Sequence, residues 1–196
     1  AVITLDEAGL WTDGRYFLQA GKQLEGTTIT LRKMGEPGVP TIPEYLAEAL
    51  PSGGTLGVDG RVISVNTGDE YEKIAADKGG KIQYHQDLID QIWTDRPELS
   101  REPVFALGVE YAGETTENKL TRIREEMKKN HADKHVLTTL DDICWTLNIR
   151  GNDVEFFPLV LSYAVITMDS VELYIDESKL DDELKASLSK DGVHLH

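Results

Sequence analysis

Hydrophobic and polar positions alternate in short runs, and these runs are separated by stretches with helical spacing. The alternating runs predict strands at 27–34, 55–59, 81–85, 136–138 and 193–195. Apolar residues at helical spacing predict helices at 14–25, 41–50, 69–78, 87–93, 116–130, 140–147 and 181–189. Because strands alternate with helices, the chain is expected to be an α/β protein with mixed sheets flanked by helices.

The start of the chain returns in altered form near its end. Residues 1–17 read AVITLDEAGLWTDGRYF, and residues 164–180 read AVITMDSVELYIDESKL. Each copy predicts two strands joined by a tight turn, with an aspartate (Asp13 or Asp176) at the end of the second strand and a helix after it. Chance similarity between two hairpins is the alternative. The favoured interpretation is a tandem pair of related α/β units.

The two copies occupy different places in their units. Helix, strand and helix patterns precede the second copy, but nothing precedes the first. Conversely, a long series of elements follows the first copy, and only a short one follows the second. If the units are related, both are expected to be truncated. The chain is then expected to be a piece of a longer protein.

One segment reads as a linker between the two units. Residues 94–103 (TDRPELSREP) contain two prolines and several charges, but only one large apolar side chain. The sequence therefore predicts a first domain at 1–93 that lacks its start, and a second domain at 104–196 that lacks its end.

The composition restricts the possible partners. The formal net charge of −15 argues against a surface that binds nucleic acid or an anionic membrane, because phosphates would be repelled, but it leaves basic peptides and proteins open. The single cysteine, Cys144, cannot form an internal disulfide, which fits a reducing compartment. The longest apolar run, 156–168, is too short and too interrupted to span a bilayer, and no leader pattern is present. A cytoplasmic location is the default expectation.

Motifs for common active sites do not occur in the chain. It has no glycine-rich phosphate loop, no His-Glu-x-x-His and no cysteine pair. His131 and His135 have the spacing of two metal ligands, but they fall across a predicted helix end, so solvated side chains are the favoured reading. His194 and His196 could share a strand face, although a polar face is the commoner explanation. From the residues alone, the chain is predicted to be a binding or structural α/β unit with no catalytic, metal-binding or cofactor-binding residues of its own.

Several blocks resemble a known family. Residues 10–20 (LWTDGRYFLQA) resemble a block in the first amino-terminal domain of three-domain Xaa-Pro aminopeptidases, or aminopeptidases P. Residues 142–153 (DICWTLNIRGND) resemble a block in their second domain. Residues 56–59 (LGVD) and 92–97 (IWTDRP) match further blocks in the same order, so the resemblance covers nearly the whole chain.

The resemblance implies two tandem creatinase-N-terminal-like domains. In this pita-bread superfamily they precede a catalytic domain that binds two metal ions, usually manganese, and uses a bridging hydroxide to cleave the bond before proline. The metal-binding motifs do not occur here, so the piece is expected to be inactive alone. It is expected to pack on its own catalytic domain, to narrow access for proline-containing peptides and to aid dimerisation.

Another branch of the same superfamily suggests an alternative function. Its histone-chaperone branch keeps the fold without metals and binds basic protein segments, which the net charge of −15 would suit. The WTDGRYF and RGND blocks resemble the peptidase branch instead.

Six residues are candidates for a domain interface or an active-site rim. Arg150, Asn152 and Asp153 lie in a predicted polar loop, where hydrogen bonds that fix the loop are an equally supported role. Trp11 and Tyr16 are candidates whose favoured place is the core, and Arg15 is expected to pair with an internal carboxylate. Gly151, within the same loop, is expected to supply a backbone angle that a bulkier residue could not.

Overall fold

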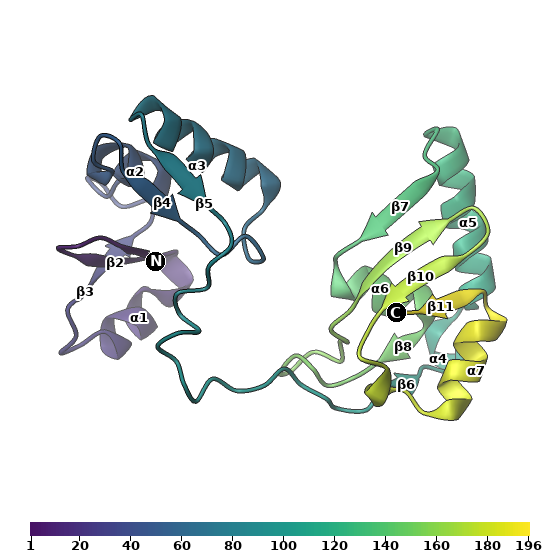
Figure 1. Ribbon diagram of the computed structural model, residues 1–196. Coiled ribbons are helices and arrows are strands. Elements are labelled where there is room, and N and C mark those ends of the chain that lie inside the picture. The colour runs from purple at the N-terminus through teal and green to yellow at the C-terminus, as the bar shows by residue number, and fades with distance from the viewer. The chain divides into compact units, whose positions relative to one another are not determined.

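The computed structural model describes residues 1–196, which form two compact units, Ala1–Arg96 and Pro97–His196 (Figure 1). Both units contain strands and helices, and both contain a sheet with parallel and antiparallel neighbours. The α/β class and the mixed sheets predicted from the sequence are therefore confirmed.

The first unit begins with a three-stranded sheet. Strand β2 (Ala8–Thr12) lies between β1 (Val2–Ile3), to which it is antiparallel, and β3 (Ile29–Lys33), to which it is parallel. Helix α1 (Phe17–Gln23) forms the crossover between β2 and β3. Because parallel neighbours need such a crossover, the predicted order of strand, helix and strand fixes the topology here.

The second half of this unit adds two helices and a parallel strand pair. Helix α2 (Ile42–Ala49) is followed by β4 (Thr55–Gly57), α3 (Val65–Asp77) and β5 (Lys81–Gln83). Thr41 and Glu44 form a capping box at the start of α2, as the sequence indicates. The prediction placed the start of α3 at residue 69, but the helix begins at Val65 because the side chain of Ser64 caps it.

The helix predicted at 87–93 is wrong. The structure has turns over this segment. Asp87 Oδ1 accepts hydrogen bonds from the backbone N–H groups of Ile89 and Asp90, at 3.0 and 3.1 Å, and Asp87 Oδ2 lies 3.0 Å from Arg61 and 2.9 Å from Arg96. The aspartate side chain caps the first turn as it would at a helix N-terminus, but no helix continues from this turn.

The second unit contains a four-stranded sheet in the order β11-β10-β9-β7. Its strands are β7 (Lys134–Leu137), β9 (Tyr163–Thr167), β10 (Val171–Tyr174) and β11 (Val193–Leu195), and only β10 and β11 are parallel. The predicted helices are present as α5 (Thr116–Lys129), α6 (Leu140–Leu147) and α7 (Asp182–Lys190). Three short elements escaped prediction, namely β6 (Phe105–Ala106), α4 (Val109–Ala112) and β8 (Ile149–Arg150).

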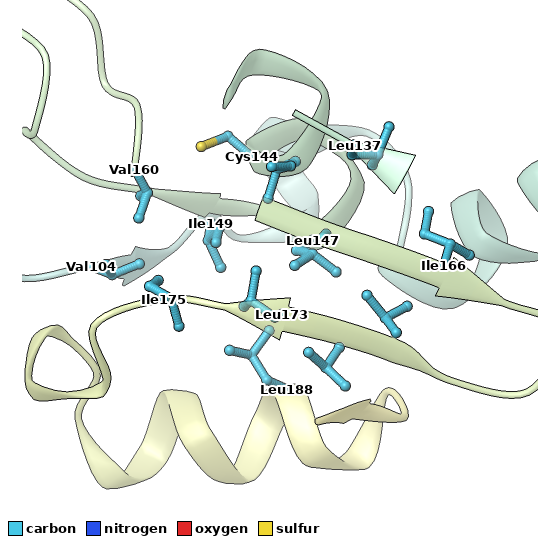
Figure 2. Packing of buried hydrophobic residues seen from close by; sticks show 14 of the residues in the cluster. Val104, Leu137, Cys144, Leu147, Ile149, Val160, Ile166, Leu173, Ile175 and Leu188 are labelled. Atoms are coloured by element: carbon cyan, nitrogen blue, oxygen red, sulfur yellow. The ribbon is translucent and has the colours of Figure 1, made fainter. Parts of the chain in front are cut away.

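The main core lies between this sheet and its helices. Leu173 and Ile166, from β10 and β9, are fully buried, and Leu188 from α7 points toward Leu173 (Figure 2). Ile149 and Cys144 complete the layer on the side of α6. No helix in the chain is long and apolar enough to cross a membrane.

The repeat seen in the sequence is also a structural repeat. Val2 pairs with Gly9 in the first hairpin, and the residues 163 positions later, Val165 and Glu172, pair in the second. A short 3-10 helix follows each hairpin, and the side chain of Asp13 caps the first as that of Asp176 caps the second. The interpretation as two related units is therefore confirmed.

Candidate interface and active-site rim

The loop at 150–158 leaves β8 and carries three of the predicted site residues. Its base is held by Arg150, whose Nη1 donates to the carbonyl oxygens of Cys144 (2.7 Å) and Ile149 (2.8 Å). Arg150 is half-buried and sits opposite Phe105 in the antiparallel pair of β6 and β8. Its guanidinium therefore ties the start of the loop to the end of α6.

Asp153 anchors the same loop from its other side. Its side chain is fully buried and forms an ion pair with Lys179, whose side chain is 2% exposed. Asp153 Oδ2 also accepts from the backbone N–H of Leu161 at 2.7 Å, while Oδ1 has no partner. A buried charge needs its counter-charge. The pair therefore fixes the loop against the 3-10 helix Glu177–Lys179.

Lys179 was not among the predicted site residues. In the sequence it is a charged residue after a hairpin, and Asp153 lies 26 positions earlier. Sequence periodicity assigns such a lysine to solvent. No signal in the sequence identified it, because the corresponding residue of the first copy, Tyr16, is exposed.

Gly151 does not supply the special backbone angle that the sequence suggested. The backbone angle φ of Gly151 is not positive. A Cβ built at this position would lie 2.9 Å from Cγ2 of Val160, which is fully buried. Gly151 is therefore needed for close packing, and a larger residue would push on the core.

The outer part of the loop faces solvent. Asn152 is exposed, and Phe156 and Phe157 are 91% and 59% exposed. Phe156 also has a positive φ of 68°, which is uncommon for a bulky residue. The structure thus separates Arg150 and Asp153, which hold the loop, from a tip with exposed polar and aromatic side chains.

Trp11 lies inside the first unit and not on its surface. It is 7% exposed, its Nε1 donates to the carbonyl of Pro40 at 2.7 Å, and its ring centroid is 5.0 Å from that of Tyr45 on α2. The Arg32 guanidinium is 5.8 Å from the Trp11 ring centroid. These contacts join the end of β2 to the segment after β3.

Arg15 and Tyr16 lie on the surface at the junction of β2 and α1. Arg15 pairs with Asp13 at 2.9 Å, a carboxylate that is exposed and not internal as expected, and this pairing lowers the pKa of Asp13 to about 2. Tyr16 is 48% exposed, contrary to the core position that its pattern favoured.

A second buried lysine also escaped prediction. Lys119 on α5 is 1% exposed, and its Nζ donates to the Trp145 carbonyl (2.7 Å) and to Asn148 Oδ1 (2.6 Å). Nζ also lies 4.4 Å from the centroid of the Trp145 ring. Burial lowers the pKa of Lys119. The lysine links α5 to the end of α6, and only its helical spacing with Ile123 and Met127 indicated a buried face.

The two C-terminal histidines share a carboxylate. His194 Nδ1 lies 3.1 Å from Glu172 Oε1, and His196 Nε2 lies 2.7 Å from Glu172 Oε2. The Ser170 hydroxyl donates to Glu172 Oε1 at 2.6 Å. No cluster of three or more His, Cys, Asp or Glu side chains with the geometry of a metal site exists within residues 1–196.

Replacing Glu172 by glutamine is expected to change the acid stability. The Ser170 hydroxyl, and then the His196 ring, lower the pKa of Glu172 from 4.5 to about 2. An ionised Glu172 therefore stabilises the fold fully above about pH 4.5, and this contribution is lost as the pH falls toward about 2. Urea unfolding midpoints measured across this range should change less in Glu172→Gln than in the wild type.

The matched control is Glu155→Gln, at an exposed carboxylate in the loop tip. It should keep the wild-type pH dependence. An unchanged pH dependence in Glu172→Gln would show that the two histidines and the serine do not hold an ionised Glu172.

Comparison with protein families and known proteins identifies relatives of the whole chain. Residues 1–92 and residues 95–196 match two models, each described as a creatinase/prolidase N-terminal domain. A probable Xaa-Pro aminopeptidase P from Neurospora crassa is 43% identical over 98% of this chain and 28% of its own length. A Xaa-Pro aminopeptidase from Caenorhabditis elegans is 39% identical over 100% of this chain and 32% of its own length.

A solved structure matches as well. The X-prolyl aminopeptidase of Caenorhabditis elegans, described as a cytosolic enzyme with a di-nuclear active site, superposes with a TM-score of 0.93 at 39% identity over 99% of this chain. The chain covers 32% of that structure. It therefore spans about a third of the length of these relatives, and corresponds to the part that the two N-terminal domain models describe.

Proposed function

Since this chain belongs to the creatinase/prolidase N-terminal domain family, we propose that it forms the non-catalytic amino-terminal region of a metal-dependent Xaa-Pro aminopeptidase. The observation that carries the proposal is the match of the whole chain, at 39% identity and a TM-score of 0.93, to an X-prolyl aminopeptidase. In this proposal the complete protein is cytoplasmic and hydrolyses the bond between an N-terminal residue and a following proline.

The catalytic metals belong to the rest of the complete protein. We propose two divalent ions, with manganese as the expected metal, and the di-nuclear site described for the Caenorhabditis elegans enzyme supports the number. The residues of this chain do not fit such a centre, because they contain no cluster of three potential ligands. No catalytic step is therefore derived from them.

The role of this chain is to pack on the catalytic domain and to narrow access for peptides. The 150–158 loop supports this role, because a buried ion pair and Arg150 hold its base while Asn152 and two phenylalanines remain exposed. Arg150 and Asp153 are positioning residues in this proposal, and Asn152 contacts the catalytic domain. Arg15 and Tyr16 offer a second exposed contact, whereas Trp11 supports it from the core.

Residues 94–103 are proposed to link the two domains, at 1–93 and 104–196. The charge of −15 and the exposed side chains are compatible with a homodimer of the complete protein and with no nucleic-acid or membrane partner. The linker, the two domain ranges and these partners are proposed from the sequence.

The proposal is tested by expressing the complete source reading frame beside residues 1–196. With manganese, the long form should release the first residue of a tripeptide whose second residue is proline, and 1–196 should release none. A long form that lacks two aspartates, one histidine and two glutamates in its downstream part, or that leaves the tripeptide intact, would overturn the proposal.

A binding module for basic proteins is the second candidate, because the chain carries a charge of −15. Mixing residues 1–196 with core histones in low and in high salt tests it. Tight binding that weakens steeply with salt would favour this function. Weak binding at low salt would exclude it.

A further inference from the structure

One face of the second unit's sheet carries no helix. Side chains alternate along each strand, so those of Leu173, Ile166 and Leu137 point into the core. The view in Figure 1 looks onto β9 and β10 with α5 and α6 behind them. We call the other side the open face and define it by the residues at the alternate positions: Lys134, Val136, Tyr163, Val165, Thr167, Glu172, Tyr174, His194 and His196.

The end of the open face around Tyr163 and Tyr174 is apolar and aromatic although it is exposed to water. Val136, Tyr163 and Tyr174 are 62%, 61% and 46% exposed. Tyr163 and Tyr174 are direct cross-strand neighbours, and the Tyr174 ring stacks on His196 at a centroid distance of 4.9 Å. A hollow of about 860 Å³ lies beside these three residues. A contiguous aromatic surface of this kind indicates an interaction site.

The first unit shows what covers the equivalent face. In the repeat, Trp11 on β2 corresponds to Tyr174 on β10. The guanidinium of Arg32, on the parallel neighbour β3, lies 5.8 Å from the Trp11 ring, as the ring of His196 lies beside Tyr174 in the second unit. The two surfaces therefore have the same construction, with an aromatic ring on one strand and a basic side chain beside it.

A helix covers this surface in the first unit. Tyr45 of α2 packs on Trp11 at 5.0 Å, and its hydroxyl donates to Glu7. Pro40, just before α2, accepts the hydrogen bond from Trp11 Nε1. As a result Trp11 is 7% exposed, whereas Tyr174 is 46% exposed. The helix α2 follows β3, and β3 corresponds to β11, the last element of the chain.

We propose that the open face is the docking surface for a helix equivalent to α2, supplied by the polypeptide that follows β11 in the complete protein. Two observations favour this occupant. The relatives are about three times as long as this chain, so they contain polypeptide outside it. In the first unit, the connection 34–41 after β3 is enough to bring α2 onto this face.

The chemistry of the face specifies the helix. Glu172 is already held by Ser170, His194 and His196, and Lys134 and Thr167 lie at the opposite end of the face from Tyr174. The part around Tyr163 and Tyr174 is therefore aromatic and aliphatic. The docking helix should therefore be amphipathic and place a large apolar or aromatic side chain over Tyr174, as α2 places Tyr45 over Trp11.

Hydroxyl-radical footprinting read by mass spectrometry tests the proposal. Residues 1–196 are compared with the same chain extended by the next roughly 50 codons of its source reading frame, the span from the end of β3 to the end of β5 in the first unit. Oxidation of Tyr163 and Tyr174 should fall severalfold in the extended chain. Oxidation of Tyr111, which is 79% exposed on α4, should stay the same.

A substitution within the open face provides a second test of the docking. Tyr174→Glu should leave the unfolding of 1–196 nearly unchanged because this side chain is exposed, and should restore the oxidation of Tyr163 in the extended chain. Unchanged oxidation of Tyr174 on extension, a stop codon after His196, or protection of Tyr174 in 1–196 that grows with its concentration would overturn the proposal. The last result would identify a second copy as the occupant. The test requires no peptidase activity, so its outcome is independent of the proposed function.

Discussion

Lys179→Ala is expected to lower the free energy of unfolding of the second unit by about 3–5 kcal/mol, because it leaves Asp153 buried without its counter-charge. Asp153 already has one oxygen without a partner, and after the substitution only the N–H of Leu161 would remain as a donor to its side chain. Hydrogen exchange along a urea series, read on peptides from β9 and β10, measures the loss.

Two comparisons separate this effect from a general loss of charge. Lys185 pairs with Glu177 at 3.4 Å on the surface, and Lys185→Ala should cost less than about 1 kcal/mol. The double variant Lys179→Met with Asp153→Leu should recover part of the loss, since it removes both buried charges. If Lys179→Ala were as mild as Lys185→Ala, Asp153 would have another counter-charge or would be reached by water.

The repeat explains why much of the fold is predictable from the sequence. Two hairpins with the same apolar pattern, the same turn and an aspartate at the same position form the same local structure, with the same pairing register and a capped 3-10 helix after each. In both turns the threonine hydroxyl, of Thr4 or Thr167, accepts backbone N–H groups two and three residues later. Such contacts lie within a few residues and can be inferred from the sequence.

The parts that could not be predicted depend on contacts between distant residues. The helix expected at 87–93 is replaced by turns, and Asp87 at the start of this segment pairs with Arg61, a contact that the local pattern does not contain. Lys119 and Lys179 are buried because carbonyl, amide or carboxylate oxygens far along the chain reach them. For the candidate site, the sequence pattern located the 150–158 loop. It could not show which loop residues are buried, because Asp153 is held by the distant Lys179 and Gly151 packs against Val160.

Leu173→Ala is expected to destabilise the second unit by about 2–5 kcal/mol, because it deletes a fully buried side chain and leaves a cavity. Leu173 lies in the centre of β10, between α7 and the layer formed by Ile149 and Leu147 (Figure 2). Segment-resolved hydrogen exchange should show faster exchange over β9 and β10, and little change over β1 and β2 in the first unit.

The repeat offers a matched control at Leu10, the residue of the first copy that corresponds to Leu173. Leu10 is half-buried, and its neighbours on the same face, Ile3 and Ile29, are 69% and 39% exposed. Leu10→Ala should therefore cost less than half as much, because water already reaches that face. Equal losses at the two positions would mean that the face of Leu10 is as well covered as that of Leu173, either by a second copy of the chain or by a packing partner from elsewhere in the complete protein.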